Sequence, residues 1–323
     1  MVNILKINDK KVDSEFMDLY ENGMRAGHYI GFEGARNHYN LRLGNTTILY
    51  GHPTSGKSQF MYQLLISMVV NYEMRPIIYS PETGTAAEIY CELIHCLTGK
   101  SMNKAHKNYI TEKELYNAKA FVQEYFTVIE GNDEAGISFE QWFEIVKEAK
   151  KLYNCNLAVI DNWNDLDHNL KEKGNGLISE YLKYALPKWN RFAKYHNIHN
   201  IMVCHARNPT VEKGEQFPRA PRPDEIEGGS VWYAKAQSLI CIHRNYIEHN
   251  GNFIQSNIVD IDIRKAKPKI VGVKGRFALG FDLIKNAYYE EFDGYQRYIS
   301  TPFNNIDNNK SKVDSFYQNN IPF

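Results

Sequence analysis

The sequence predicts an α/β fold with a mostly parallel, twisted sheet flanked by helices. Two features of residues 44–290 support this fold: apolar, β-forming runs alternate with helical stretches, and several of the runs are apolar throughout. Continuous apolar runs are typical of parallel strands that helices cover on both faces. The alternation itself favours right-handed βαβ units.

Seven strands and five helices are expected along this region. The strands are predicted at TTILYG (46–51), RPIIYS (75–80), FTVIE (126–130), NLAVID (156–161), NIMVCH (200–205), SLICIHR (238–244) and VDIDIRK (259–265). The helices are predicted at 57–72, 85–98, 111–125, 138–151 and 177–196. A further short helix is expected at 13–27, because Phe16, Met17, Tyr20 and Met24 recur at helical spacing.

The pattern divides the chain into an N-terminal arm (1–40), one main domain (41–295) and a polar, flexible C-terminal tail (296–323). Two stretches inside the main domain, 164–179 and 206–230, do not fit the strand–helix alternation. Loops of this length inside a compact domain are usually functional or disordered.

Composition excludes several classes of protein. The 38 basic residues equal the 38 acidic residues, so a strongly basic coat for nucleic acid is absent, although a local basic loop or a channel built by several subunits is compatible with neutrality. The five cysteines form no CxxC pair, as expected for reduced thiols in a cytosolic protein. The start has no signal-peptide pattern, and no apolar stretch reaches the ~18 residues of a membrane span. We therefore expect a cytoplasmic location and no membrane partner.

The segment GHPTSGKS matches the phosphate-binding pattern G-x-x-x-x-G-K-[ST], with a strand before it and a helix after it. Glycines let backbone amides approach phosphate oxygens, and the helix N-terminus faces the same anion. This predicts binding of ATP, or another nucleoside triphosphate, with Mg²⁺; the alternative is a Gly-rich turn with a surface lysine. The predicted cradle is Gly51, His52, Pro53, Thr54, Ser55, Gly56, Lys57 and Ser58, with Lys57 on the β/γ-phosphates and Ser58 on Mg²⁺.

Three further strand ends carry polar residues that such a site could use. Asp161 ends NLAVID and is predicted as the second metal-side group, and Glu82 follows RPIIYS and is a candidate for activating water. A strand ending beside the P-loop strand would aim Glu82 at the γ-phosphate. The alternative role of Glu82 is a favourable charge in the first turn of a helix. His205 ends NIMVCH and could sense the γ-phosphate, although a lone histidine is more often structural.

These pieces, in this order, resemble the RecA-like motor domain of the DnaB-family hexameric replicative helicases, in particular the branch of phage helicase-primases and mitochondrial Twinkle. The resemblance covers about residues 25–290. The motifs that carry it are GHPTSGKS, YSPETG, LAVIDNWNDL, VCHARNP, IEGGSVWYAKAQSLICIHRN and IRKAKPKIVGVKGRFALGF. It implies a ring-shaped, ATP-dependent DNA helicase of phage- or plasmid-like replication, with Glu82 as catalytic base and His205 as sensor.

The resemblance also implies that a neighbouring subunit supplies positive charge to each nucleotide. The matching basic cluster is Arg264, Lys265, Lys267 and Lys269. The family usually has Lys-x-Arg where this chain has Lys265-Ala266-Lys267, so lysine stands at the finger position. Lysine lacks the bidentate fork of arginine, which implies slower hydrolysis or a role for another residue such as Arg244 or Arg276.

In the family, the two long loops face a central channel that holds single-stranded DNA. The matching candidates are Lys171 and Lys173 in the first loop, Lys213, Arg219 and Arg222 in the second, and Gly228, Gly229 and Ser230 at a helix start. Few aromatic residues occur in these loops, so backbone tracking is expected instead of base stacking.

The expected partners are single-stranded DNA, copies of the chain in a hexameric ring, and a replisome protein that docks the C-terminal Ile-Pro-Phe. The helix at 13–27 would pack on the adjacent subunit. Two other functions remain open: a RecA/RadA-like recombination or repair ATPase that forms filaments, and an inactive nucleotide-binding protein that assembles or loads others.

Overall fold

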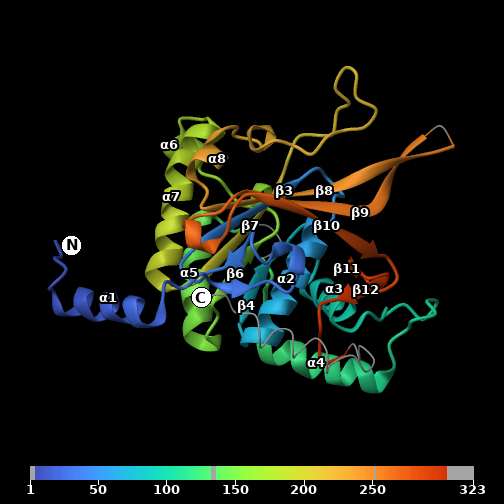
Figure 1. The fold of residues 1–323 in the computed structure, drawn as a ribbon, viewed down its shortest axis with the longest axis horizontal. Coiled ribbons are helices and arrows are strands. Elements are labelled where there is room, and N and C mark those ends of the chain that lie inside the picture. The colour runs from blue at the N-terminus through green and yellow to red at the C-terminus, as the bar shows by residue number, and fades with distance from the viewer. Residues whose placement is uncertain (1–3, 132–135, 251, 304–323) are drawn as a thin grey trace.

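The computed structural model describes residues 4–131, 136–250 and 252–303 (Figure 1). Within these residues, ten strands form one sheet in the order β12-β11-β10-β9-β8-β3-β7-β6-β4-β5. The strands are β3 (Thr46–Gly51), β4 (Pro76–Tyr79), β5 (Thr127–Ile129), β6 (Leu157–Ile160), β7 (His199–His205), β8 (Ser238–His249), β9 (Asn252–Lys265), β10 (Gly275–Asp282), β11 (Ala287–Phe292) and β12 (Tyr295–Tyr298). Six neighbouring strands pair in parallel, in the sheet order β8-β3-β7-β6-β4-β5. Strands β9, β10, β11 and β12 extend the sheet beyond β8 by antiparallel pairing.

All seven predicted strands and all five predicted helices of the main domain are present, so the α/β fold class is confirmed. The helices are α2 (Lys57–Tyr72), α3 (Ala86–Thr98), α4 (Glu112–Tyr125), α5 (Phe139–Tyr153) and α7 (Ile178–His196). The sequence pattern predicted no separate strands at β10, β11 and β12. β11 and β12 are short and partly exposed, and the first half of β10 has no fully buried residue, so these strands lack the continuous apolar signal of the central strands.

The central strands are apolar throughout because each one contributes to two cores. Leu157 and Val159 of β6 face the core under α2, α3 and α4, whereas Ala158 and Ile160 face the core under α5, α7 and α8 (Val231–Lys235). Residues in a strand alternate between its two faces, so a strand with both faces covered has no polar positions. This packing fixes the carboxyl ends of the parallel strands at one edge of the sheet.

Capping residues mark where three of the helices begin. The side chains of Thr85, Thr111 and Ser138 each accept a hydrogen bond from the backbone three residues later. A Glu or Gln at that later position bonds back to the cap, which completes a capping box in each case. These reciprocal bonds account for the close match between the predicted and observed starts of α3, α4 and α5.

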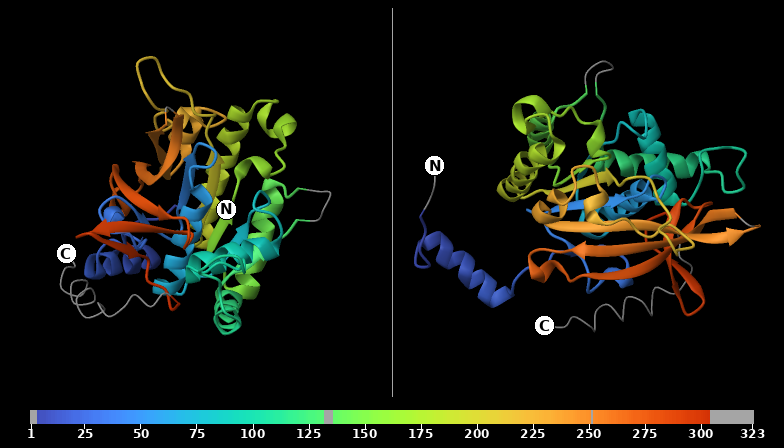
Figure 2. Two further views of the ribbon diagram at one scale, coloured as in Figure 1. Left: turned by 90° about the vertical axis from the view of Figure 1, so that its right-hand side faces the viewer. Right: turned by 90° about the horizontal axis from the view of Figure 1, so that it is seen from above.

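The N-terminal helix stands apart from the rest of the chain (Figure 2). Helix α1 spans Lys10–Asn22, three residues earlier at its start than predicted, and it stops before Gly23, whose φ is 76°. It buries none of its residues. The chain rejoins the core soon afterwards through β1 (His28–Tyr29), the short helix η1 (Glu33–Ala35) and β2 (Asn40–Leu41), where Ile30 and Phe32 are buried.

The two long loops contain short helices. The first holds η2 (Trp163–Asp165) and α6 (Leu170–Gly174), and the second holds η3 (Pro223–Glu225). A fourth short helix, η4 (Lys269–Val271), lies between β9 and β10. Strand β12 continues the sheet past residue 295, and the predicted docking end at Phe323 lies outside the described residues. No helix in the described part of the chain is long and apolar enough to cross a membrane.

One buried histidine links the start of the sheet to the segment before it. His199 in β7 is fully buried, with Nδ1 2.7 Å from the Arg42 carbonyl oxygen and Nε2 3.0 Å from Thr47 Oγ1. A carbonyl only accepts, so Nδ1 carries the proton in the neutral ring. Burial lowers the pKa of His199 to about 4, since charging the ring there is unfavourable.

We expect His199 to make folding sensitive to acid. Below its unfolded pKa, near 6.5, the unfolded chain binds a proton that the folded chain excludes, so stability falls as pH drops toward 4. The contribution lost is at most about 3 kcal/mol. Urea unfolding at pH 7.5 and pH 4.5 measures it: His199→Asn should lose less stability than the wild type over this interval. The exposed His106→Asn should behave like the wild type, and an unchanged pH dependence in His199→Asn would contradict the account.

Candidate nucleotide-binding site

Four predicted site residues meet at one edge of the sheet. Strands β3, β7, β6 and β4 are parallel neighbours, and the P-loop, His205, Asp161 and Glu82 follow or end them in that order. Strands β7 and β6 lie between β3 and β4 in the sheet. The strand that precedes Glu82 is therefore not a direct neighbour of the P-loop strand. Glu82 still reaches the centre of the site, since the turn after β4 extends toward β6 and β7.

The P-loop turn leaves no room for side chains at its two glycines. A Cβ at Gly51 would lie 2.2 Å from the Ile242 carbonyl oxygen, and a Cβ at Gly56 would lie 2.1 Å from Tyr288 Oη. Gly56 also has a φ of 91°, in the left-handed region that favours glycine. The buried Tyr288 hydroxyl donates to the Gly56 carbonyl at 3.0 Å, so β11 supports the turn at the start of α2.

Lys57 is the first residue of α2 and is almost fully buried, at 5% exposure. Its Nζ donates to the His52 carbonyl at 2.9 Å across the P-loop turn. Burial lowers the pKa of Lys57, and the nearby carboxylates of Asp161 and Glu82 oppose this shift. An ammonium group that is buried at the mouth of a helix and has one backbone acceptor gains free energy from an anion placed beside it.

Asp161 is fully buried, and neither carboxylate oxygen has a hydrogen-bond partner among the described residues. Burial raises the pKa of Asp161 to about 6, and the charge of Glu82 adds to the rise, while Ser58 and Lys57 oppose it. A bound cation would supply the missing compensation. The described residues contain no cluster of three or more His, Cys, Asp or Glu able to hold a metal. Mg²⁺ needs none here, because it is usually held by one or two protein oxygens, substrate phosphates and water.

Glu82 is engaged by two neighbours at the carboxyl ends of β6 and β7. Its Oε2 accepts from His205 Nε2 at 3.0 Å and from Asn162 Nδ2. Burial alone would raise the pKa of Glu82, but these hydrogen bonds and the charges of His205 and Lys57 hold it below the ordinary value. Glu82 is therefore an ionised carboxylate whose side chain is still 51% exposed. Sequence reasoning missed Asn162, and its only signal was its position directly after Asp161.

His52 connects the P-loop to the second long loop. Its buried imidazole lies 2.7 Å from the Arg207 carbonyl oxygen through Nδ1 and 3.3 Å from the Arg219 carbonyl oxygen through Nε2. Gln255 of β9 contacts the P-loop from another side, through Thr54 Oγ1 at 3.2 Å. The His52 side chain is thus used in holding the loop.

The three predicted basic residues near the reaction lie at two separate places. Arg244 in β8 lies beside the P-loop of its own chain, with Nη2 3.8 Å from a Cβ built at Gly56 and its guanidinium 5.3 Å from the Phe281 ring centroid. Lys265 and Lys267 lie at the opposite edge of the sheet, because Lys265 pairs with Leu239 at the start of β8. Any action of Arg244 on a nucleotide is therefore within one chain, whereas Lys265 and Lys267 face away from their own P-loop.

The residues predicted to contact DNA differ in whether their side chains already form ion pairs within the chain. Lys171 and Lys173 lie in α6, and Lys213 is exposed in the second loop. Arg219 instead pairs with Glu225 at 2.6 Å and Glu212 at 2.8 Å, so it holds the loop together. Arg222 lies 3.6 Å from Asp224 and 3.7 Å from Glu225. The remaining candidates are Gly228 and Gly229, which both have positive φ, and Ser230, which directly precedes α8.

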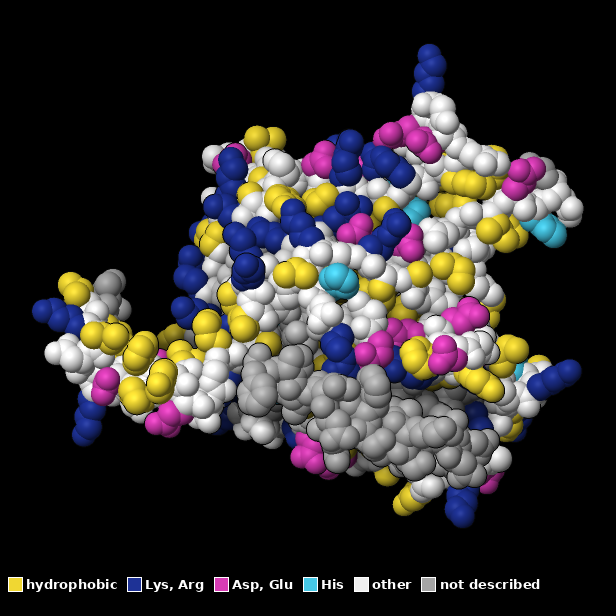
Figure 3. Space-filling model, viewed as in Figure 1, with side chains coloured by type: hydrophobic (Ala, Val, Ile, Leu, Met, Phe, Trp, Pro, Cys, Tyr) yellow, Lys and Arg dark blue, Asp and Glu magenta, His cyan; other side chains and the backbone are white. Residues whose placement is uncertain are grey.

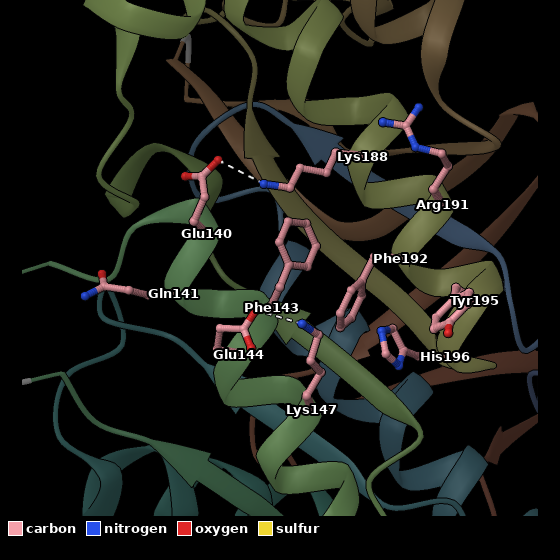
Figure 4. A pocket seen from close by; sticks show the side chains of 10 residues that line it. All are labelled: Glu140, Gln141, Phe143, Glu144, Lys147, Lys188, Arg191, Phe192, Tyr195 and His196. Carbon is pink, nitrogen blue, oxygen red and sulfur yellow. Dashed lines mark hydrogen bonds and ion pairs between the residues drawn. The ribbon is translucent and has the colours of Figure 1, made fainter. Parts of the chain in front are cut away.

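A cavity of about 560 Å³ between α5 and α7 contains none of these residues (Figure 4). Phe143 and Phe192 form its apolar part, and the ion pair between Lys188 and Glu140, at 3.2 Å, lies at its rim. The site at the sheet edge is defined here by its converging polar groups.

Comparisons with known proteins agree with this geometry. The chain is 25% identical over 274 residues to the Twinkle homolog protein, chloroplastic/mitochondrial, of Arabidopsis thaliana, an alignment that covers 82% of this chain and 37% of that protein. The chain thus spans little more than a third of the length of this relative. No family model matches the chain.

Two solved structures share the fold at 16% sequence identity. One, described as an ATPase domain, matches with a TM-score of 0.65, over 87% of this chain and 99% of that one. A DnaB-like replicative helicase, described with its interactions with primase, matches with a TM-score of 0.66, over 87% of this chain and 68% of that one. Together with the sequence match, these likenesses support the resemblance predicted from the motifs: the chain shares its fold with an ATPase domain and with a DnaB-like replicative helicase.

Proposed function

We propose that the chain is an ATP-driven DNA helicase that translocates on single-stranded DNA during replication, as part of a ring of identical subunits. The observation that carries the proposal is the convergence of Lys57, Asp161, Glu82 and His205 at one edge of the sheet. The relatives named above support the assignment, since they are described as a Twinkle homolog and a DnaB-like replicative helicase.

In this proposal, each residue has a separate task at the nucleotide. The amides of the P-loop and the N-terminus of α2 hold the phosphates, and Lys57 exchanges the His52 carbonyl for phosphate oxygens. Ser58 and Asp161 would hold Mg²⁺, which would supply positive charge to the phosphates. Glu82 orients the attacking water and accepts its proton, for which an ionised, partly exposed carboxylate is suited.

His205 offers a route by which the site senses the nucleotide. In the described state its Nε2 donates to Glu82, and its buried Nδ1 has no hydrogen-bond partner in the described part of the chain. A γ-phosphate beside β7 would compete with Glu82 for the same N–H group. A switch of His205 from Glu82 to phosphate would release the carboxylate for catalysis only when the triphosphate is bound.

In this proposal, the DNA-binding surface is the end of the molecule where both long loops emerge (Figure 1). Lys171, Lys173 and Lys213 supply the positive charge there, and Arg222 is partly available, whereas Arg219 acts through loop structure. Because the His52 side chain contacts the backbone at both ends of the stretch 207–219, a shift of the P-loop would also move this loop. A few phosphate contacts from each subunit would suffice in a ring.

Glu82→Gln tests the catalytic assignment. We expect single-stranded DNA to stimulate ATP hydrolysis by the wild type, and Glu82→Gln to lower kcat by roughly 10²–10⁴-fold while ATP binding persists, because glutamine cannot accept the proton. The exposed Glu112→Gln should leave hydrolysis unchanged. Steady-state hydrolysis with and without DNA, beside binding of a fluorescent ATP analogue, provides the measurement. A wild type that binds ATP without turning it over would contradict the motor function.

Helix α1 provides the assembly surface in this proposal. It leaves Phe16, Met17, Leu19 and Tyr20 exposed, the last at 78%, while burying nothing in its own chain. An amphipathic helix without an apolar partner in its own chain gains free energy by docking on another surface. A second copy of this chain would supply that surface and so close a ring.

Disrupting that face should change the oligomer and leave the fold intact. We expect Phe16→Glu with Tyr20→Glu to shift the Mg·ATP-bound protein from hexamers to smaller species, because two charges would enter the apolar contact. Lys11→Glu lies on the opposite side of the helix by its spacing and should assemble like the wild type. Mass photometry measures both, and electron microscopy separates rings from filaments. An unchanged hexamer in the double variant would sink this role of α1.

A further inference from the structure

Asn162 uses both ends of its side chain. It is buried, and it directly follows Asp161 after the end of β6. Its Nδ2 donates to Glu82 Oε2, the same oxygen that accepts from His205, and its Oδ1 accepts from the Asn164 backbone at 2.8 Å. The side chain therefore caps η2 and restrains the proposed catalytic carboxylate at the same time.

This restraint acts against the proposed role of Glu82 as a base. A carboxylate oxygen offers two lone pairs, and the two donated hydrogen bonds occupy both of them on Oε2. Burial alone would raise the pKa of Glu82, but the hydrogen bonds from His205 and Asn162 favour the ionised form and hold the pKa below its ordinary value. A carboxylate with a lower pKa is a weaker base. Loss of one donor would therefore leave a stronger base with a free lone pair.

Asn164 connects this restraint to the second long loop. Its Nδ2 donates to Glu227 Oε2 at 3.1 Å, and Glu227 directly precedes the predicted DNA contacts at 228–230. Trp163 of η2 also packs edge-on against Trp232 of α8, with 5.8 Å between the ring centroids. Both indoles are buried, and Trp232 Nε1 donates to the Glu227 carbonyl oxygen at 2.6 Å. Movement of Glu227 would thus displace η2 through a hydrogen bond and through packed rings.

The second donor to Glu82 is connected to the same part of the loop. His205 ends β7, and the next residue, Ala206, forms a β-bridge with Ile226, the residue before Glu227. Both hydrogen bonds of Glu82 therefore come from segments that contact one stretch of the chain. Lys and Arg side chains gather on the visible face around α6, α7 and α8 (Figure 3), and this charge would attract a DNA strand to the end of the molecule that holds this stretch.

Resting on the proposed function, we propose that Asn162 is a positioning residue that keeps Glu82 from activating water until single-stranded DNA binds at residues 228–230. A DNA phosphate that contacts these residues would lie beside the Glu227 carboxylate and repel it, because both groups are negative. The displaced Glu227 would draw Asn164 and η2 with it, and Asn162 would release Glu82. DNA would then speed hydrolysis by freeing the base, without adding a catalytic group.

DNA affinity tests the link without any need for hydrolysis. Coupling between two sites is reciprocal, so weakening the hold on Glu82 should favour the DNA-bound arrangement. Asn162→Ser keeps a capping hydroxyl for η2 but is too short to reach Glu82. With Mg²⁺ and a non-hydrolysable ATP analogue, we expect this variant to bind fluorescein-labelled oligothymidylate roughly fivefold more tightly or better by fluorescence anisotropy. In a Glu82→Ala background the same change should have no effect, since the bond is already absent.

Hydrolysis tests the release of the base. We expect Asn162→Ser to raise kcat in the absence of DNA by roughly threefold or more, because the restraint on Glu82 is lost. Asn164→Ala should instead lower the stimulation of kcat by DNA by a similar factor, because the signal from Glu227 is interrupted. Asn117→Ala, a change at an exposed position of α4, is the matched control and should keep the stimulation of the wild type.

The two measurements separate this inference from the proposed function. If the wild type hydrolyses no ATP but Asn162→Ser tightens DNA binding only when Glu82 is present, the motor function fails and the link stands. If DNA stimulates the wild type and both asparagine variants behave like it, the motor function stands and the inference is overturned. An equal effect of Asn162→Ser with and without Glu82, or a lower kcat without DNA, would show a purely structural role and would also overturn it. A wild type that binds no DNA would overturn both.

Discussion

The candidate site depends on the parallel pairing of β3, β7, β6 and β4. Parallel strands end at the same edge, so this pairing brings the P-loop, His205, Asp161 and Glu82 together although 154 residues separate Gly51 from His205. Two apolar cores hold the register, because each central strand has buried side chains on both faces. A shift of one strand by one residue would exchange its faces and move its terminal polar group, so core packing and site geometry are one constraint.

In the described state, the polar groups of the site are engaged with one another. Lys57 donates to the P-loop carbonyl of His52, and Glu82 accepts from His205 and Asn162. Both carboxylate oxygens of Asp161, the hydroxyl of Ser55 and Nδ1 of His205 are buried without hydrogen-bond partners in the described part of the chain. Once a metal-bound triphosphate is present, Lys57 and His205 could bond to phosphate oxygens and Asp161 to the metal, which are stronger interactions than the present ones. The nucleotide would therefore rearrange a few existing hydrogen bonds, and His52 extends that rearrangement to the long loop.

The sequence predicted the parts of this account that local chemistry determines. Strands that are apolar throughout and helices with a capping residue have a local signal, and the predicted central strands and the starts of α3, α4 and α5 lie within a few residues of the observed ones. The hairpin of β8 and β9 extends beyond the predicted ranges 238–244 and 259–265, because its outer part is not apolar throughout. Tertiary contacts determined the rest. No spacing rule could show that Arg219 is paired with Glu225, that Lys265 points back at α8, or that Asn162 contacts Glu82.

The most direct test of the central claim is a cryo-electron microscopy structure with Mg²⁺ and a non-hydrolysable ATP analogue. The account predicts the triphosphate on the turn Gly51–Ser58, Mg²⁺ beside Ser58 and Asp161, and Lys57 Nζ moved from the His52 carbonyl to phosphate oxygens. A triphosphate bound elsewhere, or one on the turn with Lys57 still bonded to His52 and Asp161 remote from the metal, would contradict it.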